Sequence, residues 1–323
     1  MMNDSESVIT RIAIVGCGTI GICWAAYFLS RGLEVSAYDP DASARAAFAD
    51  LVAADMETLG GSPREPKVCG ALADAVEQAE LVVENAPESA EVKRRLLADI
   101  QRLALPSALI VSSTSSMQHS DIALDAPEPS RIAIAHPFNP PHLVPLVELY
   151  GTDAEVVDRL ATFYRGIGKQ PVVMKKEMVG HIANRLTSAV WREALYLLQE
   201  GVASVEDIDR AVTAGPGMRW AIQGPFLTYH LGGGKGGIKH YLEHLGPSQQ
   251  YRWASLGSPT VDEALKSRVV AGVEQAACGQ SLSELSAQRD AQLVALQQAI
   301  EAAPQSAQPP AHQPADQPAE VKS

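Results

Sequence analysis

The sequence has few cysteines, and those few lack the spacing of a disulfide framework or a metal site. Four cysteines occur in 323 residues, without a CxxC pair and without clustered histidines. Zinc sites are usually recognised by such closely spaced pairs, and disulfide frameworks are typical of small secreted domains. We therefore expect a reduced, cytoplasmic protein with no bound metal.

A surplus of positive charge and long apolar stretches are also lacking. The chain holds 26 Lys and Arg against 38 Asp and Glu, which gives a formal net charge of −12. This balance argues against the basic surface that a nucleic acid needs. No apolar stretch approaches the roughly 18 residues of a membrane span, and the first ten residues lack the apolar core of a signal peptide. We expect neither a nucleic acid nor a membrane as a partner.

The first half of the chain alternates short β-type runs with helical patterns. Because this alternation is typical of βαβ units, we predict an α/β fold with a Rossmann-type, doubly wound and mainly parallel sheet. One of the intervening helices should follow Ser89 as its cap and continue to Leu103. The runs that we interpret as strands are Arg11–Val15, Leu33–Tyr38, Leu81–Asn85, Ala108–Ser113 and Arg131–Ala135.

The second half of the chain shows helical patterns alone. We predict a sheet domain over residues 1–177, an all-helical domain over 178–303 and a disordered tail, rich in Pro, Gln and Ala, over 304–323. Ser204 and Asp207 have the spacing of a capping box. The predicted helices of this half are Gly180–Gly201, Ser204–Val212, Val261–Ala277 and Leu282–Ile300.

A glycine-rich loop follows the first predicted strand. Gly16, Gly18 and Gly21 form a GxGxxG motif that opens a helix within the first βαβ unit. In the dinucleotide-binding fingerprint the first glycine allows a tight turn and the second lets the backbone approach a pyrophosphate. The third allows close packing of helix and strand. The context of strand, loop and helix favours a dinucleotide site over a simple turn.

The residues around this loop indicate which dinucleotide binds. Thr19 and Ile20 begin the helix, whose N-terminal amides and dipole attract phosphate. Asp39 ends the second strand, where its carboxylate can accept hydrogen bonds from ribose hydroxyls and would repel a 2′-phosphate. No arginine directly follows Asp39, so we predict NAD as the cofactor rather than NADP.

One histidine and one glutamate stand in apolar surroundings. His136 lies between an apolar run and several prolines, and Glu148 follows twelve positions later inside another apolar run. A lone histidine in such a place is more often a satisfied core residue than a catalyst. Yet histidine titrates near neutrality, so it could take the proton of a secondary alcohol while hydride leaves. A carboxylate on the other ring nitrogen would orient the ring and stabilise the imidazolium.

Three motifs that follow one another along the chain resemble the 3-hydroxyacyl-CoA dehydrogenase superfamily. The resemblance extends to about residue 300 and implies an NAD-dependent oxidoreductase that forms a homodimer through its helical domain. The motifs are SSTSS at 112–116, HPFNPP with VPLVELYG at 136–151, and GHIANRL at 180–186.

This resemblance assigns roles to particular residues. It implies that Glu88 and Lys93 approach the nicotinamide half of NAD. The alternative for these two residues is a solvated helix start. The catalytic residues that it implies are Ser115, His136, Glu148 and Asn184.

The chain departs from the acyl-CoA members of the superfamily in two places. Residues 215–231 form a segment longer than the usual GYPMGPF-like one, and the GxGFY ending is absent. These departures resemble the branch that holds L-gulonate 3-dehydrogenase (lambda-crystallin) and L-carnitine dehydrogenase. The resemblance implies a small L-3-hydroxy acid as the substrate and leaves carnitine and gulonate balanced. A 3-hydroxyacyl-CoA dehydrogenase and a catalytically silent NAD-binding structural protein are the alternative functions.

A carboxylate and a quaternary ammonium group would each need a binding residue. Arg219 could anchor a carboxylate through a bidentate pair, although most arginines are simply exposed. Aromatic faces recognise trimethylammonium groups, and Trp191, Trp220, Phe138 and Tyr229 could supply them. Core packing is the alternative role for such aromatic side chains.

Overall fold

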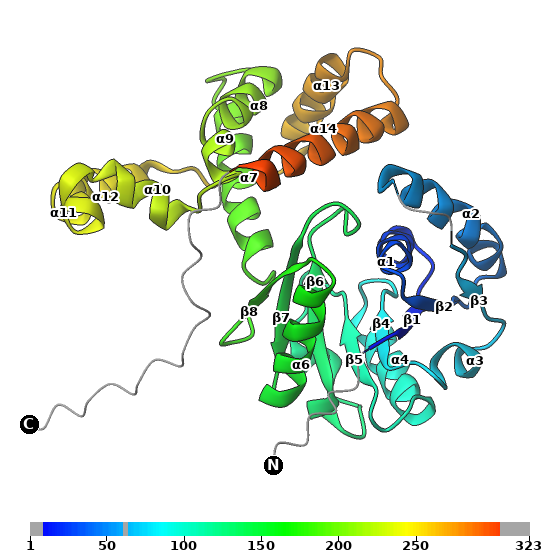
Figure 1. Cartoon of the computed structure of the whole chain (residues 1–323). Coiled ribbons are helices and arrows are strands. Elements are labelled where there is room, and N and C mark those ends of the chain that lie inside the picture. Colours follow the sequence, from blue (N-terminus) through cyan, green and yellow to red (C-terminus); the bar gives the residue numbers. More distant parts are fainter. Residues whose placement is uncertain (1–8, 61–63, 304–323) are drawn as a thin grey trace, which may run out of the picture.

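The computed structural model describes residues 9–60 and 64–303, so the predicted disorder of 304–323 lies outside the described residues. Eight strands form one sheet in the order β3-β2-β1-β4-β5-β6-β7-β8 (Figure 1). The strands are β1 (Arg11–Val15), β2 (Glu34–Tyr38), β3 (Lys67–Val68), β4 (Leu81–Glu84), β5 (Leu109–Ser112), β6 (Ile132–Pro137), β7 (Leu146–Gly151) and β8 (Gln170–Val173).

The strand pairs confirm the doubly wound, mainly parallel sheet that the sequence predicts. Every pair of neighbouring strands is parallel except β6 and β7. The chain first builds outward from β1 to β2 and β3, then returns to place β4 on the other side of β1. Ligands bind such sheets beyond the carboxyl ends of the strands, at the point where the strand order reverses.

Alternate side chains along each strand pack against helices on opposite faces of the sheet. On one face Ile12 of β1 shares a core with Trp24 of α1 and with side chains of α2 and α6. On the other face Ala13 shares a core with Leu97 of α4 and with side chains of α3 and α5. Burying one such large apolar side chain stabilises the fold by about 1.5–3 kcal/mol. The helices are α1 (Thr19–Ser30), α2 (Ala42–Thr58), α3 (Leu72–Val76), α4 (Ala90–Leu103), α5 (His119–Ile122) and α6 (Ala154–Gly166).

Two predicted helix caps have different outcomes. Ser89 occupies the N-cap position of α4 and the helix ends at Leu103, as predicted, but the Ser89 side chain makes no capping hydrogen bond. Glu91 in the first turn places negative charge near the helix N-terminus instead, which interacts favourably with the helix dipole. Ser204 does cap α8, because its hydroxyl accepts a hydrogen bond from the Asp207 N–H at 3.1 Å.

The described part of the chain beyond β8, up to residue 303, has helices and no further strand, as the sequence predicts. α7 rises from the sheet, and α10, α11 and α12 project to one side (Figure 1). β8 ends at Val173 and α7 begins at Ala183, and the predicted boundary after residue 177 falls between them. Across the described ranges, no helix has both the length and the apolar character needed to cross a membrane. The helices are α7 (Ala183–Gln199), α8 (Val205–Thr213), α9 (Pro216–Trp220), α10 (Pro225–Gly232), α11 (Gly237–His244), α12 (Gly246–Ser255), α13 (Glu263–Ala277) and α14 (Leu282–Ala302).

A buried ion pair lies at the carboxyl end of β4. Lys93 Nζ lies 2.9 Å from Glu84 Oε1, and the two side chains are 1% and 0% exposed. Lys93 also donates to the carbonyl of Ala86, and the Ser112 hydroxyl donates to Glu84. Both charged groups of the buried pair therefore have an ionic partner and at least one further hydrogen bond.

Replacing Lys93 by Ala should lower the free energy of unfolding by about 3–5 kcal/mol, because Glu84 would remain buried without its counter-charge. The matched control is Arg102→Ala, which breaks an exposed ion pair with Asp99 and should cost less than about 1 kcal/mol. Urea denaturation followed by circular dichroism measures both. Equal losses in the two variants would contradict the prediction.

Candidate functional site

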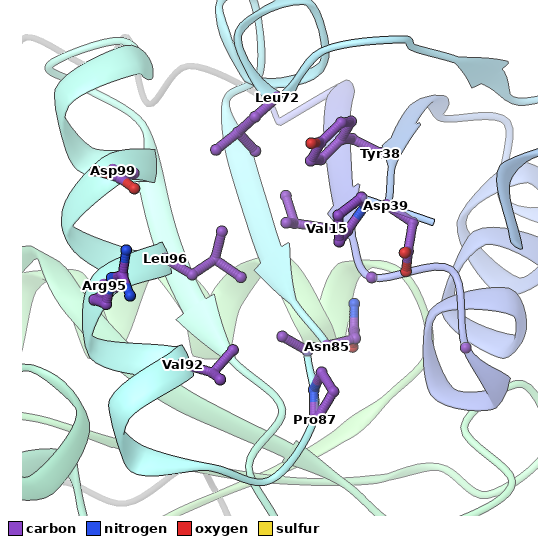
Figure 2. A pocket seen from close by; sticks show the side chains of 14 residues that line it. Val15, Tyr38, Asp39, Leu72, Asn85, Pro87, Val92, Arg95, Leu96 and Asp99 are labelled. Carbon is purple, nitrogen blue, oxygen red and sulfur yellow. The ribbon is translucent and has the colours of Figure 1, made fainter. Parts of the chain in front are cut away.

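A cavity of about 690 Å³ lies at the carboxyl ends of β1, β2 and β4. Its walls are the glycine-rich loop, the end of β2, the segment after β4 and one side of α4 (Figure 2). Apolar side chains line most of it, and the carboxylate of Asp39 stands at its edge. The side chains labelled around it are Val15, Tyr38, Asp39, Leu72, Asn85, Pro87, Val92, Arg95, Leu96 and Asp99.

The three glycines of the loop differ in what surrounds them. Gly16 has a φ of +108°, and a Cβ there would lie 2.6 Å from the Asn85 carbonyl oxygen. A Cβ on Gly21 would lie 2.0 Å from the Gly16 carbonyl oxygen, so the first and third glycines are required by the fold itself. A Cβ on Gly18 would meet no heavy atom within 4 Å. The backbone at Gly18 therefore borders open space, which is the fit that a pyrophosphate requires.

The start of α1 and the end of β2 complete this cradle. Gly18 is the N-cap of α1 and no side chain caps the helix, so the amides of its first turn, from Thr19 onward, point to the loop. Asp39 Oδ2 accepts a hydrogen bond from the Cys17 N–H at 2.8 Å, which fixes the carboxylate beside the loop. The residues present fit NAD, with the diphosphate at the helix N-terminus and a ribose at Asp39.

His136 and Glu148 are direct neighbours across the antiparallel strands β6 and β7. The strand register pairs the two residues, and His136 Nδ1 lies 2.9 Å from Glu148 Oε2. A carboxylate only accepts hydrogen bonds, so Nδ1 carries the hydrogen, and in the neutral ring Nε2 keeps its lone pair. Nε2 is therefore the ring nitrogen that can act as a base.

The second oxygen of Glu148 binds the N-terminus of α7. Glu148 Oε1 accepts hydrogen bonds from the Ile182 N–H at 2.7 Å and the Ala183 N–H at 3.0 Å. Burial raises the pKa of this carboxyl, but the hydrogen bonds from His136, Ala183 and Ile182 outweigh that effect and lower the pKa below its ordinary value. Glu148 is consequently ionised and holds His136 in one tautomer.

Ser115, Asn184 and Glu88 meet beside this pair. Asn184 Nδ2 donates to the carbonyl of Ser115 at 3.0 Å. Glu88 Oε1 accepts from the Ser115 N–H at 2.8 Å and from the Thr114 hydroxyl at 2.7 Å. Burial raises the pKa of Glu88, whereas the Thr114 hydroxyl and the charge of Lys93 lower it, with a net downward shift. The loops after β4 and β5 and the start of α7 are thereby tied together.

Lys93 lies behind this cluster rather than at its surface. Its ammonium group is bound by Glu84 at 2.9 Å and lies 3.6 Å from Glu88 Oε2. The family resemblance implies that Lys93 approaches the nicotinamide, but it does not include Glu84. An acid at the end of the apolar run LVVE, nine residues before a lysine, was the available signal.

His181 is a second residue that the sequence analysis did not select, although it stands inside the GHIANRL motif. Its ring centroid lies 5.0 Å from that of His136, and its Nε2 is 3.0 Å from the carbonyl oxygen of Thr114. Its backbone has a left-handed φ of 50°, which is uncommon outside glycine. Burial is the main cause that lowers the pKa of His181, so the ring is neutral beside His136.

Five residues are predicted for the substrate, and they come from different elements, with Tyr229 on α10. Trp191 lines a small cavity between α7, α8 and α13, and Arg219 and Trp220 belong to α9. Phe138 is half-buried in the loop after β6. In the part of the chain that the structure describes, no hydrogen bond joins these residues to His136 or Glu148.

A different cavity borders His181. It has a volume of about 460 Å³ and lies between β8 and the start of α7. Three of its lining residues are cationic, and most of the others are apolar. The lining residues are Val173, Met174, Lys175, Lys176, Met178, His181, Ile182, Arg185 and Leu186.

Comparison with known families accounts for nearly the whole of this architecture. The NAD binding domain of 3-hydroxyacyl-CoA dehydrogenase matches residues 11–178, and the C-terminal domain of the same enzyme matches residues 180–269. The chain belongs to the 3-hydroxyacyl-CoA dehydrogenase family. This membership confirms the resemblance that the three sequence motifs carry, and it confirms NAD as the cofactor.

Two relatives show which branch of the family the chain resembles. L-carnitine dehydrogenase of Streptomyces coelicolor is 45% identical over 303 residues, which cover 91% of this chain and 95% of that protein. L-carnitine dehydrogenase of Pseudomonas aeruginosa is 39% identical over 298 residues, which cover 89% and 93%. Both alignments extend over the two parts of the fold.

Two solved structures share the fold. One is 5-formyl-3-hydroxy-2-methylpyridine 4-carboxylic acid 5-dehydrogenase, with a TM-score of 0.79 and 28% identity over 91% of this chain and 99% of that one. The other is (S)-3-hydroxybutyryl-CoA dehydrogenase from Ralstonia eutropha, with a TM-score of 0.58 and 27% identity over 63% and 76%. Together with the family match, these relatives make the chain an NAD-dependent oxidoreductase that acts on a CH–OH group.

Gly18→Ala should weaken NAD binding at least about tenfold while it changes the free energy of unfolding by less than about 0.5 kcal/mol. The added Cβ would meet only the space that the pyrophosphate needs. Gly21→Ala is the matched control, and it should destabilise the fold itself because its Cβ would overlap the Gly16 carbonyl oxygen. Calorimetric titration with NAD and urea denaturation separate the two effects. Unchanged NAD affinity in Gly18→Ala would place the diphosphate elsewhere.

Proposed function

We propose that this enzyme oxidises the 3-hydroxyl group of L-carnitine to the 3-keto acid. The observation that carries the chemistry is the buried pair of His136 and Glu148, which leaves His136 Nε2 as a base of fixed orientation. The choice of substrate is supported by the two carnitine dehydrogenases that are similar over nine tenths of the chain.

The chain's own residues would divide the work as follows. NAD, when bound, supplies the hydride acceptor. His136 Nε2 takes the proton of the substrate hydroxyl, and Glu148 stabilises the imidazolium that forms. The amides of Ile182 and Ala183 hold Glu148 in place, so the pair need not reorganise during the reaction.

Two further residues would position the substrate oxygen. Asn184 uses one amide hydrogen for the carbonyl of Ser115, and its second hydrogen can donate to the substrate. The Ser115 hydroxyl donates its one hydrogen to Glu88 Oε1 at 3.2 Å, and in the proposal it turns to donate to the substrate oxygen instead. Glu88 and Lys93 would support the nicotinamide side, with Lys93 acting through Glu88 and the backbone of Ala86.

The carboxylate and the trimethylammonium group of carnitine need separate partners. Arg219, with Trp191, Trp220 and Phe138, stays our proposal for these two groups. Arg185 is an additional candidate for the carboxylate, because it lines the cavity that also contains His181, the neighbour of His136.

His136→Asn should lower kcat with L-carnitine at least about 100-fold, the smaller end of what general-base catalysis contributes. The dissociation constant for NAD should stay unchanged, because the cavity at Asp39 does not include His136. Asp158→Asn, at an exposed position of α6, is the control and should retain full activity. Initial rates of NADH formation at 340 nm and NAD titration measure these quantities.

The substrate is tested by offering L-carnitine, L-gulonate and 3-hydroxybutyryl-CoA in parallel to the purified chain with NAD. Turnover of carnitine alone supports the proposal. Turnover of gulonate or of the thioester in place of carnitine would overturn the substrate while the roles of His136 and Glu148 would stand. No turnover of any of them would favour an NAD-binding structural protein.

We also propose that two chains form a homodimer through the helical part. Helices α10 to α12 project from the rest of the chain (Figure 1) and expose large apolar side chains, with Phe226 84% and Trp253 63% exposed. A concentration of exposed large apolar side chains on neighbouring helices is uncommon on monomers and indicates an interface. A second copy would cover it, as the family resemblance implies.

The unpaired cysteines in the described ranges are compatible with the cytoplasmic location that we propose.

Light scattering after gel filtration should give twice the mass of one chain for the wild type. Trp253→Glu should shift the protein to the mass of one chain, because a charge would be buried at the centre of the apolar surface. Leu124→Glu, equally exposed but on the sheet domain, is the matched control and should stay dimeric. A wild type with the mass of one chain would contradict the proposed dimer.

A further inference from the structure

Three side chains that can bind a metal meet between α1, α2 and the loop that joins β6 to β7. Cys23 comes from α1, Asp55 from α2 and His142 from the loop. Their thiol, carboxylate and imidazole atoms all lie within 4.8 Å of one another. Cys23 and His142 are buried, and Asp55 is half-buried. The residues are distant in sequence, which is why the cysteine spacing gave no indication of a metal site.

His142 has an unusual environment for a buried histidine. His142 is only 4% exposed, and neither nitrogen of its ring has a hydrogen-bond partner among the described residues. Nδ1 approaches Asp55 Oδ2 only to 3.6 Å. Buried polar side chains are nearly always hydrogen-bonded, so a group with two unused nitrogens needs a further partner. A cation accepts the lone pair that such a ring offers.

We propose that Cys23, Asp55 and His142 bind a divalent cation of the zinc class. Zinc is bound by cysteine sulfur at about 2.3 Å and by histidine nitrogen or carboxylate oxygen at about 2.0–2.2 Å. Tetrahedral ligand atoms then lie roughly 3–4 Å apart, which small side-chain rotations reach from the present spacing. Magnesium and calcium prefer all-oxygen sites, and the sulfur and nitrogen here select against them.

The charges of the site agree with this choice. A thiolate and a carboxylate together carry two negative charges, which a divalent cation neutralises in a buried place. Binding would release the thiol proton of Cys23 to solvent as the sulfur–metal bond forms. Asp290 on α14 adds negative charge nearby, whereas Arg289 and Lys169 add positive charge.

The position of the site indicates a structural role. His142 follows His136 by six residues on the same connection, and Leu143 accepts a hydrogen bond from Gln297 of α14. A cation bound to His142 would therefore fasten the loop after the catalytic histidine to α1 and α2. The cation would stabilise the position of this loop. The metal site shares no residue with the proposed catalytic cluster.

The test is metal binding by the full chain, with any affinity tag removed. The protein is stripped with a chelator and then titrated with Zn²⁺ and, separately, with Co²⁺. We expect one equivalent of Zn²⁺ per chain and a rise in Tm. Co²⁺ should produce a near-ultraviolet thiolate-to-cobalt charge-transfer band. Mg²⁺ should neither bind stoichiometrically nor raise the Tm. The absence of stoichiometric Zn²⁺ binding by the wild type would overturn the proposal.

Variants locate the cation. Cys23→Ser should abolish the cobalt charge-transfer band, and His142→Gln should weaken Zn²⁺ binding at least about 100-fold, since even outer partners of metal ligands contribute about 10- to 100-fold. The exposed, stacked pair His240 and His244 on α11 offers an adventitious site, so the double variant H240Q/H244Q is the matched control and should bind normally. Cys278→Ser removes the exposed cysteine and should keep the band.

Two results in these variants would overturn the proposal. One is full Zn²⁺ binding by both Cys23→Ser and His142→Gln, and the other is loss of binding in H240Q/H244Q. Circular dichroism and NAD titration of each variant show whether it is folded. If Cys23→Ser does not fold, His142→Gln and the cobalt spectrum of the wild type decide the matter.

Discussion

The buried carboxylate of Glu148 connects the sheet domain to the helical part of the molecule. One oxygen accepts from His136 and the other accepts from two amides at the start of α7. A buried carboxylate needs such partners, because burial without hydrogen bonds would favour its neutral form. The requirement to satisfy one charge therefore orients His136 and also fixes where the helical part begins.

The second half of the site follows from a similar constraint. Glu88 stands at the edge of the cluster and collects hydrogen bonds from the loop after β5, while Lys93 and Glu84 neutralise one another beneath it. Hydrogen bonds and ion pairs thus connect the wall of the cofactor cavity at Ala86 with the Ser115 loop, and Asn184 extends this connection to the start of α7. Their relative positions are fixed by the burial of charge as much as by the sheet.

The sequence was sufficient for the parts of the fold that repeat a simple pattern. The strands of the central sheet are short apolar runs, and the glycine loop is recognisable because its context of strand, turn and helix is local. β7 was not predicted, since Glu148 interrupts its apolar run and prolines precede it. β8 was not predicted because Val172 and Val173 are substantially exposed at the edge of the sheet, so the expected core pattern is weak.

The functional residues divide in the same way. His136 and Glu148 could be selected as a pair from the motifs, but only the antiparallel register explains a separation of twelve residues. His181 escaped because a glycine-like backbone conformation turns its ring toward His136, and sequence does not show φ values. Helices α9 to α12 were not predicted, because glycines and prolines interrupt residues 215–255. The apolar side chains that these helices expose could therefore not be inferred from the sequence.

The single antiparallel pair in the sheet also limits how this chain can change in evolution. The residues between His136 and Glu148 can vary in composition, but the register of β6 and β7 determines which face of the sheet position 148 occupies. An insertion or deletion that slips the register by one residue would turn that position toward the face covered by α1, α2 and α6. We therefore expect that length changes compatible with function leave the register unchanged and are confined to the loop between β6 and β7. In related proteins, this loop should differ by substitutions more often than by single-residue insertions or deletions.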